Sequence, residues 1–350
     1  MSLERIEIAP GFTISKIIKG GWQLSQGHSD GKSDHAIEDM FSFVENGITT
    51  FDCADIYTGV EELIGKFLSE RRKRLGTISD VQVLTKFVPD FDILPEINKR
   101  HVEKVIDRSL KRLGVDQLDM VQFSWWSYSI PLWMETAQWL TELQQAGKIK
   151  RLSGTNFNTQ ATRALVESGI PITTLQVQYS LLDNRPEKGL IKLCKEKNIH
   201  LLCYGTVAGG FLNERWLGVP EPQAPYENRS MVKYKLMVQE FGGWDLFQSL
   251  LQTLHRIADS HQVSITNIAT RYIMEQDQVG GIIIGARDAK HISENAILFN
   301  FQLNPEDYQA IEEVISLRKG PPGDVFDIER IKDGPHGSIM RYNLNQVDAS

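Results

Sequence analysis

The sequence predicts an α/β fold, a (β/α)₈ or TIM barrel with an N-terminal β-hairpin. Three observations support this fold. A short β-branched run, a loop and an amphipathic helix follow one another eight times along the 350 residues. The strand-like runs are apolar through their middles, as expected for strands covered on both faces. Polar residues end many successive runs, which favours a barrel over the alternative, a doubly wound open sheet.

Eight runs are predicted to be the barrel strands. In chain order they are Ile17–Gly20, Thr49–Asp52, Val81–Lys86, Leu118–Ser124, Ile149–Thr155, Thr173–Gln178, Ile199–Tyr204 and Val279–Gly285. Between them, apolar residues recur at helical spacing. One such helix covers 102–113 and stops at Gly114, and others are predicted near 132–146, 160–167 and 187–197.

Three segments fall outside this repeat. Residues 3–16 are typical of a β-hairpin that caps the barrel floor. Residues 209–245 form a long loop after strand seven, and loops of this length are often lids or binding loops. Residues 319–350 form a C-terminal tail that is either mostly disordered or folded over the barrel mouth, and its aromatic residues favour folding. We expect one domain over 1–350, with a core at about 17–318.

Composition excludes several classes of protein. The net charge of −7 argues against a nucleic-acid or anionic-membrane partner. No apolar run approaches the roughly 18 residues of a membrane span, and no secretory signal is visible at the N-terminus. Three widely spaced cysteines suggest reduced thiols and a cytoplasmic protein. No metal site is predicted.

The catalytic chemistry is predicted at the ends of the second and third strands. Asp52 and Lys86 end these strands, and Tyr57 lies on the loop that follows Asp52. The three residues form an acid-catalysis set. Tyr57 would donate a proton, Lys86 would lower the pKa of Tyr57, and Asp52 would hold Lys86 charged and oriented.

Together with later runs, these residues resemble the aldo-keto reductase family from about residue 5 to 318. Asp52, Ala54, Tyr57, Glu61 and Gly65 resemble the signature around the family's catalytic acid, and Lys86 stands where its lysine stands. The later motifs that match, in order, are Gly154–Phe157, Gln176, Tyr204 with Ala208–Leu212, and Gly285–Arg287 with Glu294 and Asn295. The resemblance implies an oxidoreductase that uses NAD(P)H to reduce an aldehyde or ketone, or that oxidises the alcohol.

The resemblance also implies a cofactor extended across the barrel mouth. Asn156 and Gln176 offer amides to a carboxamide, and Tyr204 offers a flat face to a nicotinamide ring. Gly209 and Gly210 allow backbone N–H groups to approach a pyrophosphate. The implied cofactor-binding residues are Gly21, Trp22, Asp52, Thr155, Asn156, Gln176, Tyr204, Gly205, Val207, Gly209, Gly210, Leu212, Gly285, Arg287, His291, Glu294 and Asn295. No Gly-x-Gly-x-x-Gly follows the first strand, so a Rossmann site is not supported.

NADP is the expected cofactor, and NAD is the alternative. Arg287 could pair with a 2′-phosphate in bidentate fashion. Many family members have an arginine or glutamine four residues before the closing asparagine, where this chain has His291. The usual lysine near the start of this loop is also absent. The preference for NADP therefore rests mainly on Arg287.

One position departs from the family pattern. The family places a histidine after the fourth strand, where it hydrogen-bonds the substrate carbonyl, and this chain has Ser124 there. A serine hydroxyl could reach a carbonyl only through a closer pose or a bridging water. Loss of one positioned donor costs about two to three orders of magnitude in rate. Weakened carbonyl reduction and altered specificity are equally expected, with Ser124 kept among the catalytic candidates.

Aromatic residues near the strand ends favour an apolar or aromatic small-molecule substrate, a carbonyl compound or an alcohol. The substrate-contacting candidates are Trp22, Tyr57, Phe87, Trp125 and Trp126. Because of Ser124, two alternatives remain open. One is a nicotinamide-binding regulatory or sensor protein with weak turnover, resembling potassium-channel β subunits. The other is reduction of an activated carbon–carbon double bond.

Overall fold

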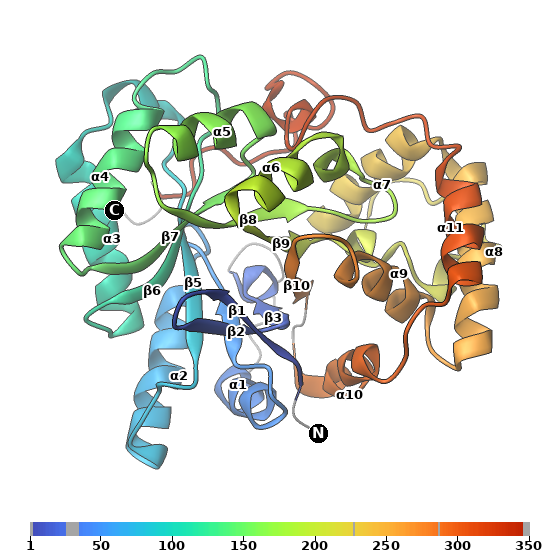
Figure 1. Cartoon of the computed structure of the whole chain (residues 1–350), viewed down its shortest axis with the longest axis horizontal. Helices are drawn as coiled ribbons and strands as arrows, with labels where there is room; N and C mark the ends of the chain where they lie inside the picture. The colour runs from blue at the N-terminus through green and yellow to red at the C-terminus, as the bar shows by residue number, and fades with distance from the viewer. Residues whose placement is uncertain (1–2, 26–34, 227, 286–287, 346–350) are drawn as a thin grey trace.

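The computed structural model describes residues 3–25, 35–226, 228–285 and 288–345. Within these residues, eight parallel strands close into a barrel in the order β10-β3-β4-β5-β6-β7-β8-β9 (Figure 1). Their bounds are β3 Ile17–Gly20, β4 Thr50–Asp52, β5 Gln82–Phe87, β6 Leu118–Phe123, β7 Ile149–Thr155, β8 Ile172–Gln178, β9 His200–Tyr204 and β10 Val279–Gly285. The TIM-barrel prediction is confirmed, and closure of β10 onto both β3 and β9 excludes the open sheet.

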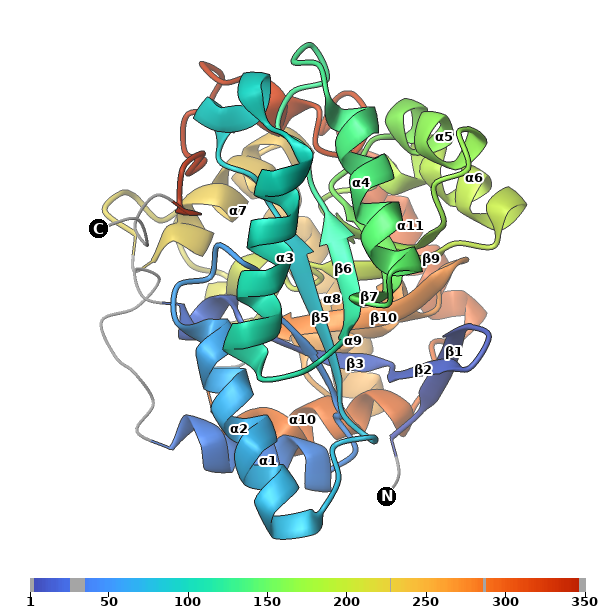
Figure 2. The ribbon, with the colours of Figure 1, turned by 90° about the vertical axis from the view of Figure 1, so that its left-hand side faces the viewer.

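Helices cover the outside of the barrel. Figure 2 shows α2, α3 and α4 in front of β5 and β6. The α-helices are α1 Ala36–Glu45, α2 Val60–Leu75, α3 Lys99–Leu113, α4 Trp133–Gln145, α5 Thr159–Glu167, α6 Leu190–Lys197, α7 Arg229–Phe241, α8 Trp244–His261, α9 Ile265–Met274, α10 Ile292–Ala296 and α11 Pro305–Ile315. Helices α2 and α3 pack so closely at Gly65 that a β-carbon there would collide with the Arg112 carbonyl. Gly65 therefore serves packing.

The N-terminal hairpin closes the floor of the barrel, as predicted. Strands β1 (Arg5–Ala9) and β2 (Phe12–Ser15) pair antiparallel. Ile8, Phe12 and Ile14 from the hairpin pack against Ile18, Leu84, Met120 and Leu202 from the barrel strands. The lower half of the barrel is therefore an apolar core, which leaves the opposite end, where the strands finish, for polar chemistry.

The segment predicted as a long loop after strand seven contains a helix. Helix α7 begins after Asn228, whose side chain accepts a hydrogen bond from the Met231 N–H at 3.0 Å. This capping arrangement is a recognised start signal, but three prolines just before it directed the prediction toward a loop. Tyr234 and Met237 on α7 are buried, so the helix packs as an integral part of the fold.

Residues 319–345 of the tail fold across the barrel mouth, which is the alternative that its aromatic residues favoured. It runs from α11 over α5 and α6 toward α3 (Figure 1). The Lys188 Nζ donates to the Pro321 carbonyl at 2.7 Å, and the Phe91 N–H donates to the Tyr342 carbonyl at 2.9 Å. Residues 319–345 are thereby tied to loops on opposite sides of the mouth.

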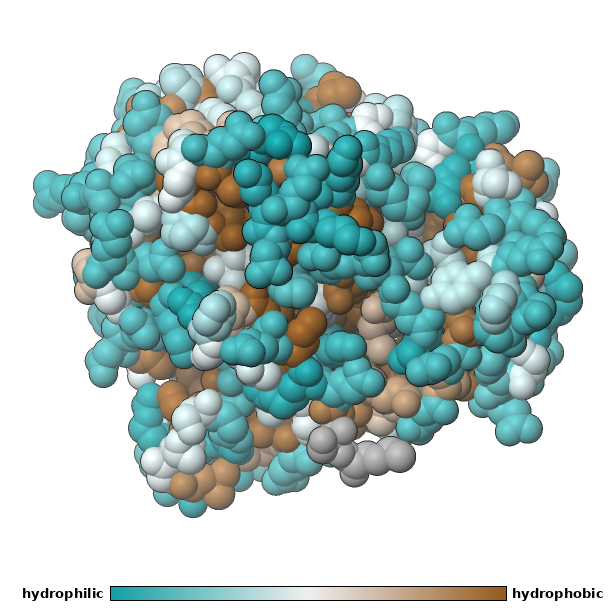
Figure 3. Space-filling model, viewed as in Figure 1, coloured by the Kyte–Doolittle hydropathy of each residue, from teal (hydrophilic) through white to brown (hydrophobic). Residues whose placement is uncertain are grey.

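One face of the molecule is mainly polar. Figure 3 shows hydrophilic side chains over most of one face, with hydrophobic side chains in smaller groups between them. Among the described residues, none of the helices combines the length and apolar character needed to cross a membrane.

Candidate active site

The structure brings the three predicted catalytic residues together. Asp52 ends β4, Lys86 lies one residue before the end of β5, and Tyr57 lies on the loop before α2. The Lys86 Nζ donates to both carboxylate oxygens of Asp52 at 2.7 Å and to the Cys53 carbonyl at 2.8 Å. It also lies 5.1 Å from the centre of the Tyr57 ring. An acid, a cation and its counter-ion therefore share one corner of the mouth.

Burial and charge act in opposite directions on these groups. Burial raises the pKa of Tyr57, the Lys86 ammonium lowers it, and the result is about 12. Burial also disfavours the charge on Lys86, but Asp52 outweighs that effect and leaves the pKa of Lys86 above its usual value. At neutral pH Tyr57 is protonated and Lys86 is charged, which are the states that proton donation requires.

Two amide side chains bind the same carboxylate. Gln176 on β8 donates from Nε2 to Asp52 Oδ1 at 2.6 Å and to Gln122 Oε1 at 2.9 Å. Gln122 on β6 donates from Nε2 to Asp52 Oδ1 at 3.0 Å. Gln176 was expected from the sequence and Gln122 was missed. A polar residue two positions before Ser124, and so on the same face of the strand, was the available signal.

Two further candidates meet at the ends of β7 and β9. Asn156 follows Thr155, which is the last residue of β7. The Tyr204 hydroxyl donates to Asn156 Oδ1 at 2.9 Å. The ammonium of Lys233, from α7, lies 5.0 Å from the centre of the Tyr204 ring. Two of the three residues assigned to a nicotinamide are therefore neighbours, and α7 adds a cation that the sequence did not predict.

The turn after β9 holds five predicted cofactor-binding residues, of which Gly209 and Gly210 were expected to approach a pyrophosphate; the others are Gly205, Val207 and Leu212. Gly209 and Gly210 have φ of +61° and +93°, values that favour glycine. A β-carbon at Gly209 would lie 2.5 Å from the ring of Tyr234 on α7. Helix α7 therefore covers this turn closely on the side where a β-carbon of residue 209 would lie.

Helix α9 links this turn to the predicted adenosine end. The Thr266 Oγ1 donates to the Leu212 carbonyl at 3.0 Å, and the Asn267 Nδ2 donates to the Glu294 carbonyl at 3.0 Å. Glu294 and Asn295 both belong to α10. The structure thus connects two candidate segments that are about 80 residues apart in the chain.

The remaining cofactor candidates lie near the start and end of the barrel sheet. A β-carbon at Gly21 would lie 2.7 Å from the Asp52 carbonyl, so this close approach requires glycine. Gly285 ends β10, which pairs with β3. Arg287 lies outside the described residues. The backbone of His291 ends a 3₁₀ turn that begins at Ala289.

The aromatic candidates occupy two different environments. Trp22 lies beside Tyr57, with ring centres 5.1 Å apart, and Trp126 packs against Tyr342 of the tail at 4.9 Å. Phe87 and Trp125 are 0% and 1% exposed, and both pack on Phe123. A substrate could touch this second pair only if the cluster opened, whereas Trp22 and Trp126 are partly exposed.

Ser124 lies directly after β6 and is 7% exposed. Its N–H donates to the Phe87 carbonyl at 3.0 Å, which holds its backbone beside β5. It follows Gln122 on the same face of the strand. The serine therefore takes its place at the mouth, next to the strand that carries Lys86.

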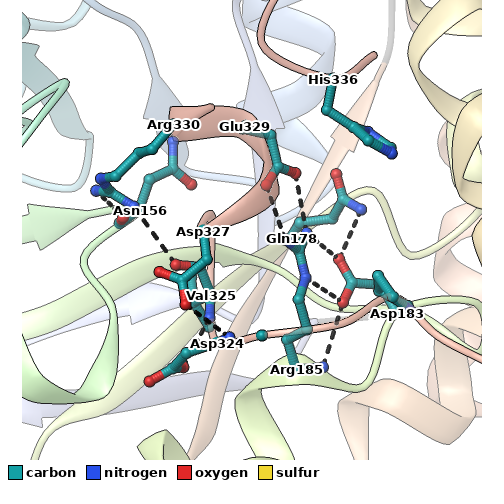
Figure 4. Close-up of polar contacts among 12 residues, drawn as sticks. Asn156, Gln178, Asp183, Arg185, Asp324, Val325, Asp327, Glu329, Arg330 and His336 are labelled. Carbon is teal, nitrogen blue, oxygen red and sulfur yellow. Dashed lines mark hydrogen bonds and ion pairs between the residues drawn. The ribbon is translucent and has the colours of Figure 1, made fainter. Parts of the chain in front are cut away.

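A second buried ion pair holds the tail over the mouth, and the sequence did not predict it. The Arg185 Nη1 and Nη2 donate to the two carboxylate oxygens of Glu329 at 2.7 and 2.9 Å (Figure 4). The Nε and Nη2 of Arg185 also donate to Asp183 at 2.9 and 2.7 Å. The next tail residue, Arg330, donates to the Asn156 carbonyl at 2.6 Å. The tail thus contacts the loop that carries a candidate cofactor residue.

A cavity of about 530 Å³ lies at the other end of the barrel, between the hairpin and the ends of α2 and α3. Its lining includes Arg5, Phe12 and Asp119, which are far in the fold from the strand ends. Within the described part of the chain, no group of His, Cys, Asp and Glu side chains is arranged to hold a metal ion.

Comparison with known proteins agrees with this geometry. The model of the aldo/keto reductase family matches residues 16–316. The chain belongs to this family of oxidoreductases. Aldo-keto reductase YhdN of Bacillus subtilis (strain 168) is 26% identical over 314 residues, which cover 87% of this chain and 91% of that protein.

Solved structures of this family share the fold. The glycerol dehydrogenase AKR11B4 from Gluconobacter oxydans superposes with a TM-score of 0.76 at 22% identity, over 93% of this chain and 99% of that one. An aldo/keto reductase from Klebsiella pneumoniae, solved with NADP and acetate, superposes with a TM-score of 0.67 at 20% identity. The superposition covers 92% of this chain and 98% of that one. The match to the family model confirms the family assignment made from the sequence motifs, and with it the assignment as an enzyme.

Proposed function

We propose that this protein is an NADP(H)-dependent, cytoplasmic reductase of aldehydes or ketones, or oxidises the corresponding alcohols, with Tyr57 as the general acid. The observation that carries the proposal is the position of the Lys86 ammonium. It binds both oxygens of Asp52 at 2.7 Å and lies against the Tyr57 ring. A cation in this position stabilises the tyrosinate that proton donation leaves behind.

The amides at the mouth fit the carboxamide of a nicotinamide. Both contacts of Gln176 described above use its nitrogen, and the contact of Asn156 with Tyr204 uses its oxygen. Gln176 thus has a carbonyl oxygen left to accept, and Asn156 has an NH₂ left to donate, which is the complement that a carboxamide requires. When bound, the reduced cofactor supplies a hydride to the carbonyl carbon.

The chain's own residues then act on the carbonyl oxygen. Tyr57 Oη gives its proton to that oxygen as negative charge develops there. Lys86 stabilises the remaining tyrosinate, and Asp52 keeps Lys86 charged. Ser124 stands in the sequence where the family has the histidine that is the second donor to this oxygen. Trp22 lies beside Tyr57 and offers an apolar wall to the substrate.

Single-turnover oxidation of bound NADPH by 4-nitrobenzaldehyde tests this proposal. Tyr57→Phe should lower the rate by about two to four orders of magnitude, the usual contribution of a general acid. Tyr308→Phe, on the outer helix α11, is the matched control and should leave the rate unchanged. If Tyr57→Phe turned over as fast as the parent, the assigned acid would be wrong.

Ser124 supports a second candidate function, a cofactor-binding regulatory protein with slow turnover. The variant Ser124→His separates the two. A rate increase of about a hundredfold, the contribution of one positioned donor, together with a slow parent and a stable protein partner, would favour the regulatory role. A fast parent whose rate barely changes would show that the serine, or a water it holds, already does the work of the histidine.

A further inference from the structure

Gln122 is a fully buried polar side chain inside a barrel whose floor is apolar. It is 0% exposed and lies on β6, two residues before Ser124. Burying an amide is unfavourable unless its donor and acceptor are satisfied. Here both ends are used, since Nε2 donates to Asp52 Oδ1 at 3.0 Å and Oε1 accepts from Gln176 Nε2 at 2.9 Å.

Asp52, Gln122 and Gln176 close a triangle of hydrogen bonds. They come from β4, β6 and β8, which are alternate strands of the barrel, and side chains from alternate strands share a layer in this fold. The third side of the triangle is the 2.6 Å bond from Gln176 Nε2 to Asp52 Oδ1. Gln122 hydrogen-bonds both other members of the triangle, and its side chain is linked to Lys86 through their shared partner Asp52.

The triangle determines how Gln176 is oriented. Its two N–H donors are directed at Asp52 and Gln122, so its carbonyl oxygen is left to face other partners. Without the acceptor on Gln122, one of these donors would lose its partner, and the amide could rotate. Gln122 also supplies one of three side-chain donors to Asp52 Oδ1, the others being Lys86 and Gln176. Hydrogen bonds of this kind favour the charged carboxylate.

We propose that Gln122 is a positioning residue that couples the cofactor's carboxamide site at Gln176 to the acid Tyr57 through Asp52 and Lys86. This inference rests on the proposed function. Cofactor binding at Gln176 and proton donation by Tyr57 then share one hydrogen-bond network, and a change at Gln122 affects both. A purely structural glutamine would affect stability without altering the pH dependence of either step.

Two variants test this role. Gln122→Met removes both hydrogen bonds at similar volume. Gln122→Glu keeps the shape, and its protonated form reproduces both contacts, because its O–H donates to Asp52 and its C=O accepts from Gln176. The ionised form cannot donate and repels Asp52. Burial and the neighbouring carboxylate raise the pKa of such a glutamate, so its ionisation falls within an accessible pH range.

Two quantities are measured, the NADPH affinity from quenching of protein fluorescence and the single-turnover rate. Both are followed from about pH 5.5 to about pH 9. We expect Gln122→Met to weaken NADPH binding and slow turnover about tenfold at every pH, the size of one buried hydrogen bond to a charged group. Gln122→Glu should match the parent at the acidic end and approach Gln122→Met as pH rises. Gln82→Met, a buried glutamine near the floor, is the matched control and should change neither quantity.

The proposal is overturned if folded Gln122→Met binds NADPH and turns over like the parent. It is also overturned if Gln122→Glu is equally impaired at both ends of the pH range. If Gln122→Met does not fold, Gln122→Glu alone decides between these outcomes. NADPH affinity needs no turnover, so a parent that reduces no carbonyl would contradict the proposed function while the binding arm still tested Gln122.

Discussion

Two buried ion pairs lie near the barrel mouth, and they differ in what their cations contact. The Arg185 guanidinium donates hydrogen bonds to two carboxylates, those of Glu329 and Asp183. Lys86 binds a single carboxylate, Asp52, and a backbone carbonyl, and it lies against the Tyr57 ring. Both cations are at most 5% exposed. The Arg185 pair fixes the tail in place, whereas the Lys86 pair lies beside a titratable hydroxyl and lowers its pKa.

The difference also appears in how each pair is held. The Arg185 and Glu329 contact is bidentate, and such a planar fork imposes a single geometry. Lys86 is a point charge whose position depends on how Asp52 is held, and Gln122 and Gln176 hold it. We infer that removing a partner from the first pair changes stability, and that removing a partner from the second changes chemistry.

The largest effect is expected for Lys86→Met. Without the cation, the pKa of Tyr57 loses the interaction that lowers it, and the tyrosinate left by proton donation is no longer stabilised. We expect the single-turnover rate to fall about a thousandfold, within the range for general acid catalysis. Lys235→Met is the matched control, because Lys235 is also a buried lysine that pairs with a carboxylate. It lies on α7, is 4% exposed and pairs with Glu221. A loss below tenfold, or an equal loss in the control, would contradict the role of Lys86.

The second effect concerns the other pair, in Glu329→Gln. Burial alone would raise the pKa of Glu329, but the Arg185 guanidinium more than offsets this effect. The fall of this pKa from 4.5 to about 2 corresponds to about 3 kcal/mol of stability. Because the folded pKa is depressed, this contribution is fully present above pH 4.5 and is lost as pH falls toward 2. Glu329→Gln should therefore lower the free energy of unfolding by that amount at pH 7, and the difference from the parent should vanish near pH 2.

Chemical unfolding at several pH values checks this prediction, and proteolysis of residues 319–345 reports release of the tail. Asp277→Asn is the control, because Asp277 and Lys195 form an exposed pair with side chains 68% and 65% exposed. Such pairs contribute less than about 1 kcal/mol. A difference between parent and Glu329→Gln that stayed constant with pH would show that the ion pair is not the source of the stability.

The same comparison shows what could be read from the sequence. Asp52, Tyr57 and Lys86 were predictable because each lies within a few residues of the end of a strand, and parallel strands bring their ends to one edge. The pair of Arg185 and Glu329 was not, because its partners are 144 residues apart and nothing local marks either one. Helix α7 and Gln122 were intermediate, since the sequence held a signal for each that the prediction did not use. Asn228 and the apolar residues of α7 gave a helix signal, and Gln122 was a polar residue in a mostly apolar strand.

The smallest effect is expected where the tail meets α5. Asp324 Oδ2 accepts from the N–H of Thr159, the first residue of α5, at 2.8 Å, while Asp327 Oδ1 accepts from Asn158 Nδ2 at 3.0 Å. Asp324 therefore caps a helix N-terminus, where a carboxylate also interacts favourably with the helix dipole. Asp324→Ala should cost about 1 kcal/mol of unfolding free energy, and Asp333→Ala, at an exposed tail position, should cost nothing measurable.

The turnover rate of Asp324→Ala shows whether the attachment of the tail to α5 affects stability alone or also affects the reaction. If the rate stays that of the parent while stability falls, the attachment of the tail to α5 is structural, in line with the ion pair of Arg185 and Glu329 in the same tail. Arg330 of the tail donates to the carbonyl of Asn156, the residue whose side chain bonds Tyr204. A rate that fell with stability would mean that this contact transmits the tail's position to the cofactor end of the mouth. In that case the Arg185 and Glu329 pair would still act on stability alone. The tail segment that this pair holds in place would, however, also affect turnover.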